Sequence, residues 1–279
     1  SIFRTPTKPR ASHEHRHCVS QIRKIVRRLR LWDIHGAARF DPKGRFVYAV
    51  DMFQGSGNQG RLTAMAIGDD GTLGTATQVD VGTAPIAYAA DPTGRYVYVA
   101  NNGKFIGVHP VGDAGPAGAT SNLNVGKFVV ALAANPDGRK VYALTTDTDG
   151  LRSCVSNWAT NWITDLMMRR GSGDGLSHCM QDGVKLQAFD IDPGNGSLIA
   201  SGTAQNAGTA VSLKVHPNGR YVYAVMANGA VRTSSVDTET GALGESSNTD
   251  ALGEPLLSAQ IDPAGRFAYA LTLTQGMQM

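Results

Sequence analysis

Cysteine is scarce in this 279-residue sequence, which contains only Cys18, Cys154 and Cys179. Three cysteines are too few for a disulfide framework, and none belongs to a C-x-x-C pair of the kind that holds structural zinc. Cys154 and Cys179 bracket one irregular segment. They therefore form either a single loop-closing disulfide in an exported protein or two separate thiols.

Long apolar runs and several common catalytic motifs are also absent. No window of about 18 apolar residues exists, so we predict no membrane-spanning helix. The sequence has no Gly-rich phosphate loop, no G-x-S-x-G turn and no H-E-x-x-H helix. The histidines of HEHRH, residues 13–17, lie in a basic end segment. We predict no metal site there and no cofactor.

Acidic residues are rare at the N-terminus. Residues 1–33 contain nine Lys or Arg against Glu14 and Asp33, although the whole chain has 26 basic and 23 acidic residues. The rest of the chain is therefore mildly acidic. Such a body lacks the basic surface that nucleic-acid binding requires, so we predict no nucleic-acid partner.

Glycine is abundant, with 33 residues, and one turn sequence recurs. The five copies are DPKGRFVYAV from Asp41, DPTGRYVYVA from Asp91, NPDGRKVYAL from Asn135, HPNGRYVYAV from His216 and DPAGRFAYAL from Asp262. A capping first residue, Pro in second place and Gly in fourth place predict a type I β-turn. By comparison with the other copies, His216 is predicted to be a turn residue and not a catalytic one.

The spacing of the copies indicates the fold. Three of the four intervals are close to 45 residues, the length of one four-stranded propeller blade. Each unit has an apolar run, the turn, a tyrosine-rich strand, a third strand, a Gly-containing turn and a polar fourth strand, as in an antiparallel meander. We therefore predict an all-β propeller with about five recognisable blades. The last unit ends soon after its second strand, RFAYALTLT, so we expect it to lack its two outer strands.

The domain organisation has two further features. The long third interval predicts an insertion at about residues 147–184, between the second and third strands of one blade. Trp158, Trp162, Ile163, Leu166 and Met167 have helical spacing within it, so it is expected to be partly helical. Residues 1–33 form a basic segment before the propeller at 34–279. This segment fits a targeting peptide, a membrane-surface helix, a tail or a strand that closes the ring.

The repeats resemble those of the lactonase-type β-propeller family, which includes propeller 6-phosphogluconolactonases and carboxymuconate cyclases, and those of related YVTN-repeat proteins. The five turns carry the resemblance, together with YVYVANN at 96–102 and FDIDPGNGSL at 189–198. The resemblance implies seven blades and a central pocket where His, Arg and acidic side chains open or form lactones. This sequence shows five units and lacks the family's PHAH-like histidine pair and DLG-type segment. No catalytic residue is therefore transferred from the family.

Topology predicts where a site lies. In such a meander, the connections between second and third strands and between blades lie on the face opposite the repeated turns. Variable loops on a rigid scaffold usually carry ligand sites. The candidates on that face are Asp51, Asn101, Lys127, Arg152, Asp174, His178 and Glu254.

Lactone opening requires a base for water and cationic groups for the oxyanion and for an acidic substrate. We assign Glu254 or His178 as the base and Lys127 and Arg152 as cationic groups. Asp51 and Asn101 are further substrate contacts in this hypothesis.

Two functions follow from these observations. The first is an enzyme that hydrolyses or forms a small acidic lactone of the phosphogluconolactone or muconolactone type. The alternative is a non-catalytic YVTN-like scaffold that binds a protein partner through the insertion. We expect a cytoplasmic protein, or an exported one if Cys154 and Cys179 are bonded.

Overall fold

The computed structural model describes residues 38–51, 59–101, 104–147, 183–226, 228–251, 256–272 and 276–278, and every regular element in these ranges is a β-strand. The strands form five antiparallel sheets, or blades. Blade 1 contains β1 (Arg39–Phe40), β2 (Phe46–Asp51), β3 (Gln59–Ile67) and β4 (Leu73–Thr83). Blade 2 contains β5 (Pro85–Ala90), β6 (Tyr96–Asn101), β7 (Phe105–Gly112), β8 (Gly115–Pro116) and β9 (Ser121–Asn124). Blade 3 contains β10 (Phe128–Ala134), β11 (Lys140–Thr146), β12 (Lys185–Ile191) and β13 (Leu198–Asn206). Blade 4 contains β14 (Ala210–Val215), β15 (Tyr221–Met226), β16 (Val231–Val236) and β17 (Leu243–Asn248). Blade 5 contains β18 (Leu256–Ile261), β19 (Ala268–Thr272) and β20 (Gly276–Gln278).

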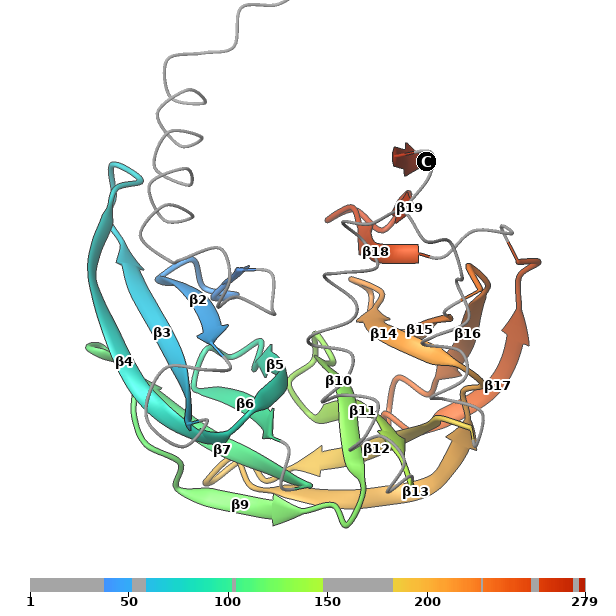
Figure 1. Cartoon of the computed structure of the whole chain (residues 1–279), viewed down its shortest axis with the longest axis horizontal. Helices are drawn as coiled ribbons and strands as arrows, with labels where there is room; N and C mark the ends of the chain where they lie inside the picture. The colour runs from blue at the N-terminus through green and yellow to red at the C-terminus, as the bar shows by residue number, and fades with distance from the viewer. Residues whose placement is uncertain are drawn as a thin grey trace, which may run out of the picture.

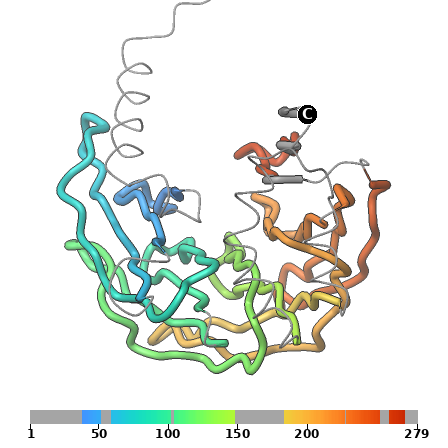
Figure 2. Tube along the Cα trace, in the orientation of Figure 1, coloured from blue at the N-terminus to red at the C-terminus, as the bar shows by residue number. Residues whose placement is uncertain are grey.

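The blades follow one another along an arc around a central space (Figure 1). The first strands β5, β10, β14 and β18 lie on the inner side, and the fourth strands β4, β9, β13 and β17 lie on the outer side. The trace in Figure 2 runs through the blades in sequence order, with blades 1 and 5 at the two ends of the arc. The predicted propeller architecture is thus confirmed, and the described residues form five sheets.

Neighbouring blades pack face to face through apolar cores. In β6, Val97 and Val99 belong to the core shared with blade 1, whereas Tyr98 and Ala100 belong to the core shared with blade 3. Both faces of this strand are therefore buried. This arrangement explains why the second strands lack the alternation of polar and apolar residues found in a sheet with one wet face.

The repeated turns have the predicted geometry. In each of the five turns, the N–H of the glycine donates to the carbonyl oxygen of the first turn residue at 2.8 or 2.9 Å. The glycines have φ between 69° and 73°, a region that residues with a Cβ rarely adopt. These turn glycines are Gly44, Gly94, Gly138, Gly219 and Gly265.

Each turn also contacts the turn of the next blade. A Cβ on Gly219 would lie 2.7 Å from Asn135 Oδ1, and a Cβ on Gly265 would overlap the ring of His216. The His216 Nε2 atom lies 2.9 Å from the carbonyl oxygen of Gly265, while Nδ1 accepts the Asn218 N–H at 3.1 Å. His216 therefore joins blade 4 to blade 5, and its prediction as a turn residue is confirmed.

The last blade differs from the sequence-based expectation. It was expected to end after its second strand, but β20 pairs with β19 as a third strand. This strand contains Gly276, Met277 and Gln278, which show neither the tyrosine pattern nor the β-branched residues of the other units. β20 forms because β19 offers a free edge with which it can pair. No local sequence pattern indicates this pairing.

Blade 3 takes β11 and β12 as adjacent strands, as expected for the second and third strands of one unit. The helix expected in the insertion lies outside the described residues, as do all of residues 1–37 and the cysteines Cys154 and Cys179. No helix in the described ranges is long and apolar enough to cross a membrane.

The turn contacts predict a graded cost for adding a side chain. Gly44 has φ 72° with nothing near its missing Cβ, so Gly44→Ala should lower the free energy of unfolding by about 1 kcal/mol through backbone strain alone. Gly219→Ala adds the overlap with Asn135 and should cost roughly 2–4 kcal/mol. Urea denaturation of both variants measures the difference. Equal losses would show that the contact between turns adds nothing.

Candidate functional site

The inner strands carry two cationic side chains at equivalent places in the repeat. The position two residues before each turn holds Arg39, Ala89, Ala133, Lys214 and Gln260. The two alanines are buried between blades, whereas Arg39 on β1 and Lys214 on β14 are each partly exposed. Blades 1 and 4 thus place a positive charge where blades 2 and 3 have a methyl group.

Arg39 and Lys214 influence each other electrostatically. Burial lowers the pKa of Lys214 to about 8, and the positive charge of Arg39 also lowers it. Within the described ranges, no carboxylate forms an ion pair with either side chain. Two cations that disfavour each other's charge in a partly buried place favour the binding of an anion near them.

Arg39 is positioned by the first strand of blade 2. Its guanidinium carbon lies 5.2 Å from the centre of the Tyr88 ring, in a cation–π contact. Tyr88 is buried, and its hydroxyl donates to the backbone carbonyl of Tyr48 at 3.1 Å. Burial raises the pKa of Tyr88 to about 12, although Arg39 acts in the opposite direction. The tyrosine is therefore a neutral and fixed platform for the arginine.

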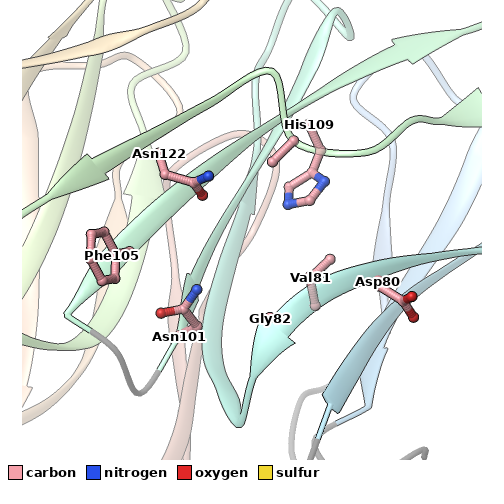
Figure 3. A pocket seen from close by; sticks show the side chains of 8 residues that line it. Asp80, Val81, Gly82, Asn101, Phe105, His109 and Asn122 are labelled. Atoms are coloured by element: carbon pink, nitrogen blue, oxygen red, sulfur yellow. The ribbon is translucent and has the colours of Figure 1, made fainter.

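Of the candidates predicted from sequence, three lie in the described part of the chain. Lys127 Nζ is 3.0 Å from Asp147 Oδ1, and both side chains are partly exposed, so this is a surface ion pair of small energy. Asp51 ends β2 and is buried within the blade. Asn101 ends β6 and lines a pocket of about 320 Å³ between blades 1 and 2 (Figure 3). The three side chains thus belong to separate local arrangements.

The remaining candidates, Arg152, Asp174, His178 and Glu254, lie outside the described residues. Their roles stay predictions. In the part of the chain that is described, no three His, Cys, Asp or Glu side chains gather as a metal site requires.

Sequence reasoning missed Arg39 and Lys214 because it searched the loops of one face. Both residues precede a repeated turn by two positions, and an alignment of the five units on their turns shows them as charged exceptions. The alignment shows that the two positions are equivalent, but it does not show that the charge of Arg39 in blade 1 affects Lys214 in blade 4.

Comparison with known proteins agrees with this architecture. A family model described as lactonase, seven-bladed β-propeller, matches residues 38–127 and 175–275. The chain belongs to this family. No curated protein matches the sequence.

Solved structures of low sequence identity share the fold of this lactonase-family chain. A protein from Bacteroides uniformis, provisionally named 6-phosphogluconolactonase, is 21% identical with a TM-score of 0.58. The alignment covers 84% of this chain and 63% of that protein. A protein from Bacteroides fragilis with the same provisional name is 18% identical with a TM-score of 0.56 and the same coverage. A protein of unknown function from Desulfotomaculum acetoxidans is 11% identical, with a TM-score of 0.57 and coverage of 84% and 62%. The chain thus spans less than two thirds of each of these proteins.

The burial of Lys214 and the positive charge of Arg39 predict a measurable titration. Lys214 should lose its proton near pH 8, and Arg39→Met should raise the pKa of Lys214 because it removes a neighbouring positive charge. NMR of isotopically labelled lysine side chains gives the titration curve, with Lys214→Arg to assign the signal. Arg61→Met on the outer part of blade 1 serves as the control and should leave the curve unchanged. An ordinary lysine titration in the wild type would contradict the predicted burial.

Proposed function

We propose that this chain hydrolyses or forms a small acidic lactone, of the phosphogluconolactone or muconolactone type, in the central space beside the inner strands. The observation that carries the proposal is the cationic pair Arg39 and Lys214 on the inner strands of a lactonase-family propeller. The provisional names of the two Bacteroides proteins are consistent with this substrate class.

The two cations suit the acidic part of such a substrate. The planar guanidinium of Arg39 can donate two parallel hydrogen bonds to a carboxylate or phosphate, and the ammonium group of Lys214 acts as a point charge. Each contact is charge-assisted and lies in a partly buried place, where water weakens it less than on the open surface. These residues would therefore hold the substrate and orient its ring.

The hydrolytic step requires a base and water. In the proposed reaction, Glu254 or His178 removes a proton from water as the water oxygen bonds to the carbonyl carbon. The ring C–O bond then breaks, and the ring oxygen takes up a proton to give a hydroxy acid. Arg152 is the proposed partner of the oxyanion that forms in between. The reaction consumes only the lactone and one water molecule.

The titration of Lys214 predicts how ligand affinity depends on pH. The ammonium form binds an anion and the neutral amine does not, so affinity should fall as pH rises through about 8. The decrease should reach up to about tenfold per pH unit. Calorimetry with 6-phosphogluconate, above the pH range where its phosphate titrates, measures this profile.

Two variants of Lys214 serve as matched controls for this profile. Lys214→Arg keeps the charge at every pH tested, so it should bind 6-phosphogluconate with a nearly flat profile. Lys214→Met should bind weakly at all pH values. A wild-type affinity that stays constant through pH 8 would remove Lys214 from the anion site.

Turnover tests the enzymatic part of the proposal. We expect the protein to open 6-phosphogluconolactone or a muconolactone faster than the uncatalysed background. Glu254→Gln or His178→Ala should lower kcat by about 10²–10⁴ if that residue is the base. Lys214→Met should instead raise KM, roughly tenfold, because it removes a charged substrate contact.

The outcomes separate the two candidate functions. Unchanged rates in both base variants would exclude Glu254 and His178 as the base. Binding of 6-phosphogluconate without turnover of any lactone would favour the non-catalytic scaffold. The scaffold hypothesis predicts that the chain binds a protein partner and that this binding is lost when residues 150–180 are deleted.

A further inference from the structure

We propose that the pocket between blades 1 and 2 is a second binding site, for a small neutral molecule rich in hydroxyl groups, such as a monosaccharide. The pocket has a volume of about 320 Å³ and lies between the outer strand β4 of blade 1 and strands β7 and β9 of blade 2. These are third and fourth strands of their blades, so the pocket is separate from the inner strands that carry Arg39 and Lys214.

Blade 2 has a glycine, Gly107, at one position of its third strand, next to two residues that line the pocket, His109 and Asn122. Gly107 pairs with Val99, and the corresponding residues of blades 1, 3 and 4 are Thr63, Gln187 and Arg232. In those blades the side chain at this position forms a hydrogen bond to the fourth strand, at 3.2, 2.9 and 3.2 Å respectively. Gly107 is buried and has no side chain to form such a bond.

A buried histidine lies beside this glycine. His109 is 1% exposed, and its Nδ1 atom lies 3.1 Å from the carbonyl oxygen of Ala117, so Nδ1 carries a proton and donates it. Burial lowers the pKa of His109, which keeps the ring neutral and leaves Nε2 as an acceptor. A Cβ on Gly107 would lie 3.0 Å from Nε2 and 3.2 Å from Asn122 Oδ1. The imidazole nitrogen and the Asn122 amide thus lie over the same glycine.

A second feature specific to blade 2 fixes the histidine. Ala117 belongs to the connection between β7 and β9, residues 113–120, which includes the short strand β8. The corresponding connections of blades 1, 3 and 4 span only residues 68–72, 192–197 and 237–242. The corresponding residues to His109 in these blades are Met65, Phe189 and Ser234. The histidine and the longer connection that orients it therefore occur together in blade 2.

The side chains around the pocket match hydroxyl groups. Figure 3 shows the side chains of Asn101, Asn122 and His109 arranged around one space, with the ring of Phe105 at its side. Asn101 Nδ2 lies close to Gly82, 2.8 Å from where a Cβ would stand, so glycine gives the amide room on the opposite wall. Two amides and one imidazole acceptor supply both donors and acceptors, as hydroxyl groups require.

The charges around the pocket favour a neutral ligand. Asp80 lies at its edge, but its carboxylate is 3.3 Å from Arg61 Nε and is compensated by that guanidinium. A charged ligand would lose solvation without gaining a counter-charge from the neutral His109. A sugar ring instead places its hydroxyl groups on the amides and its C–H face on Phe105, which is partly exposed.

Saturation-transfer NMR with D-glucose, D-galactose and D-mannose, and with D-gluconate as the charged comparison, tests the proposal. We expect the wild type to bind at least one of the neutral sugars with millimolar affinity and to bind gluconate at this pocket more weakly. Gly107→Thr introduces the residue of blade 1 and should abolish sugar binding. Asn122→Ala changes an exposed side chain and should weaken binding about fivefold, the loss of one hydrogen bond.

His109→Phe, which introduces the residue of blade 3, should also weaken sugar binding because it removes the Nε2 acceptor. Asn248→Ala changes an exposed asparagine on the fourth strand of blade 4 and is the matched control, with binding unchanged. If Gly107→Thr does not fold, as judged by thermal unfolding, Asn122→Ala decides the question. Absence of transfer to every neutral sugar at tens of millimolar, or transfer that is the same in wild type and Asn122→Ala, would overturn the proposal.

Discussion

The close contact between successive turns is the constraint on which the propeller depends. At each turn glycine the backbone has a positive φ. From blade 2 onward, a side chain of the preceding turn lies close to where a Cβ would stand, and at Gly219 and Gly265 it belongs to the first turn residue. Because each blade exposes two apolar faces, it is stable only when its neighbours cover them. The turn contacts and the apolar cores between blades together hold neighbouring blades face to face.

This constraint explains where the chain has room for function. The turn face is occupied by structural contacts that recur from blade to blade, and His216 takes part in them through Gly265. The candidate binding residues lie away from these turns, on the inner strands and in the outer part of blade 2. Arg39 and Lys214 are on the inner strands β1 and β14, whereas Gly107 and His109 are on β7, the third strand of blade 2.

Sequence alone predicted the features that repeat. Five copies of one turn gave the blade length, the strand order and the buried second strands, since these follow from local rules for proline, glycine and tyrosine. It did not predict β20, because that strand is held by the free edge of β19 and not by its own pattern. It predicted Asn101 and Lys127 on the face opposite the turns, but it could not show that Lys127 pairs with Asp147 or that Asn101 of blade 2 lies close to Gly82 of blade 1.

Departures from the repeat are not equally informative, and the contacts decide which of them indicate function. His216 replaces an aspartate or asparagine, yet its ring lies against the glycine of the next turn, as the Asn135 side chain does, so the change preserves a contact between blades. Gly107 replaces side chains that bond the fourth strand in three other blades, and blade 2 makes no such bond at this position. Lys214 replaces a buried methyl group with a charge that burial disfavours. A substitution that gives up a contact made by its counterparts in the other blades has a structural cost, and binding a ligand is the compensation that a purely structural role does not offer.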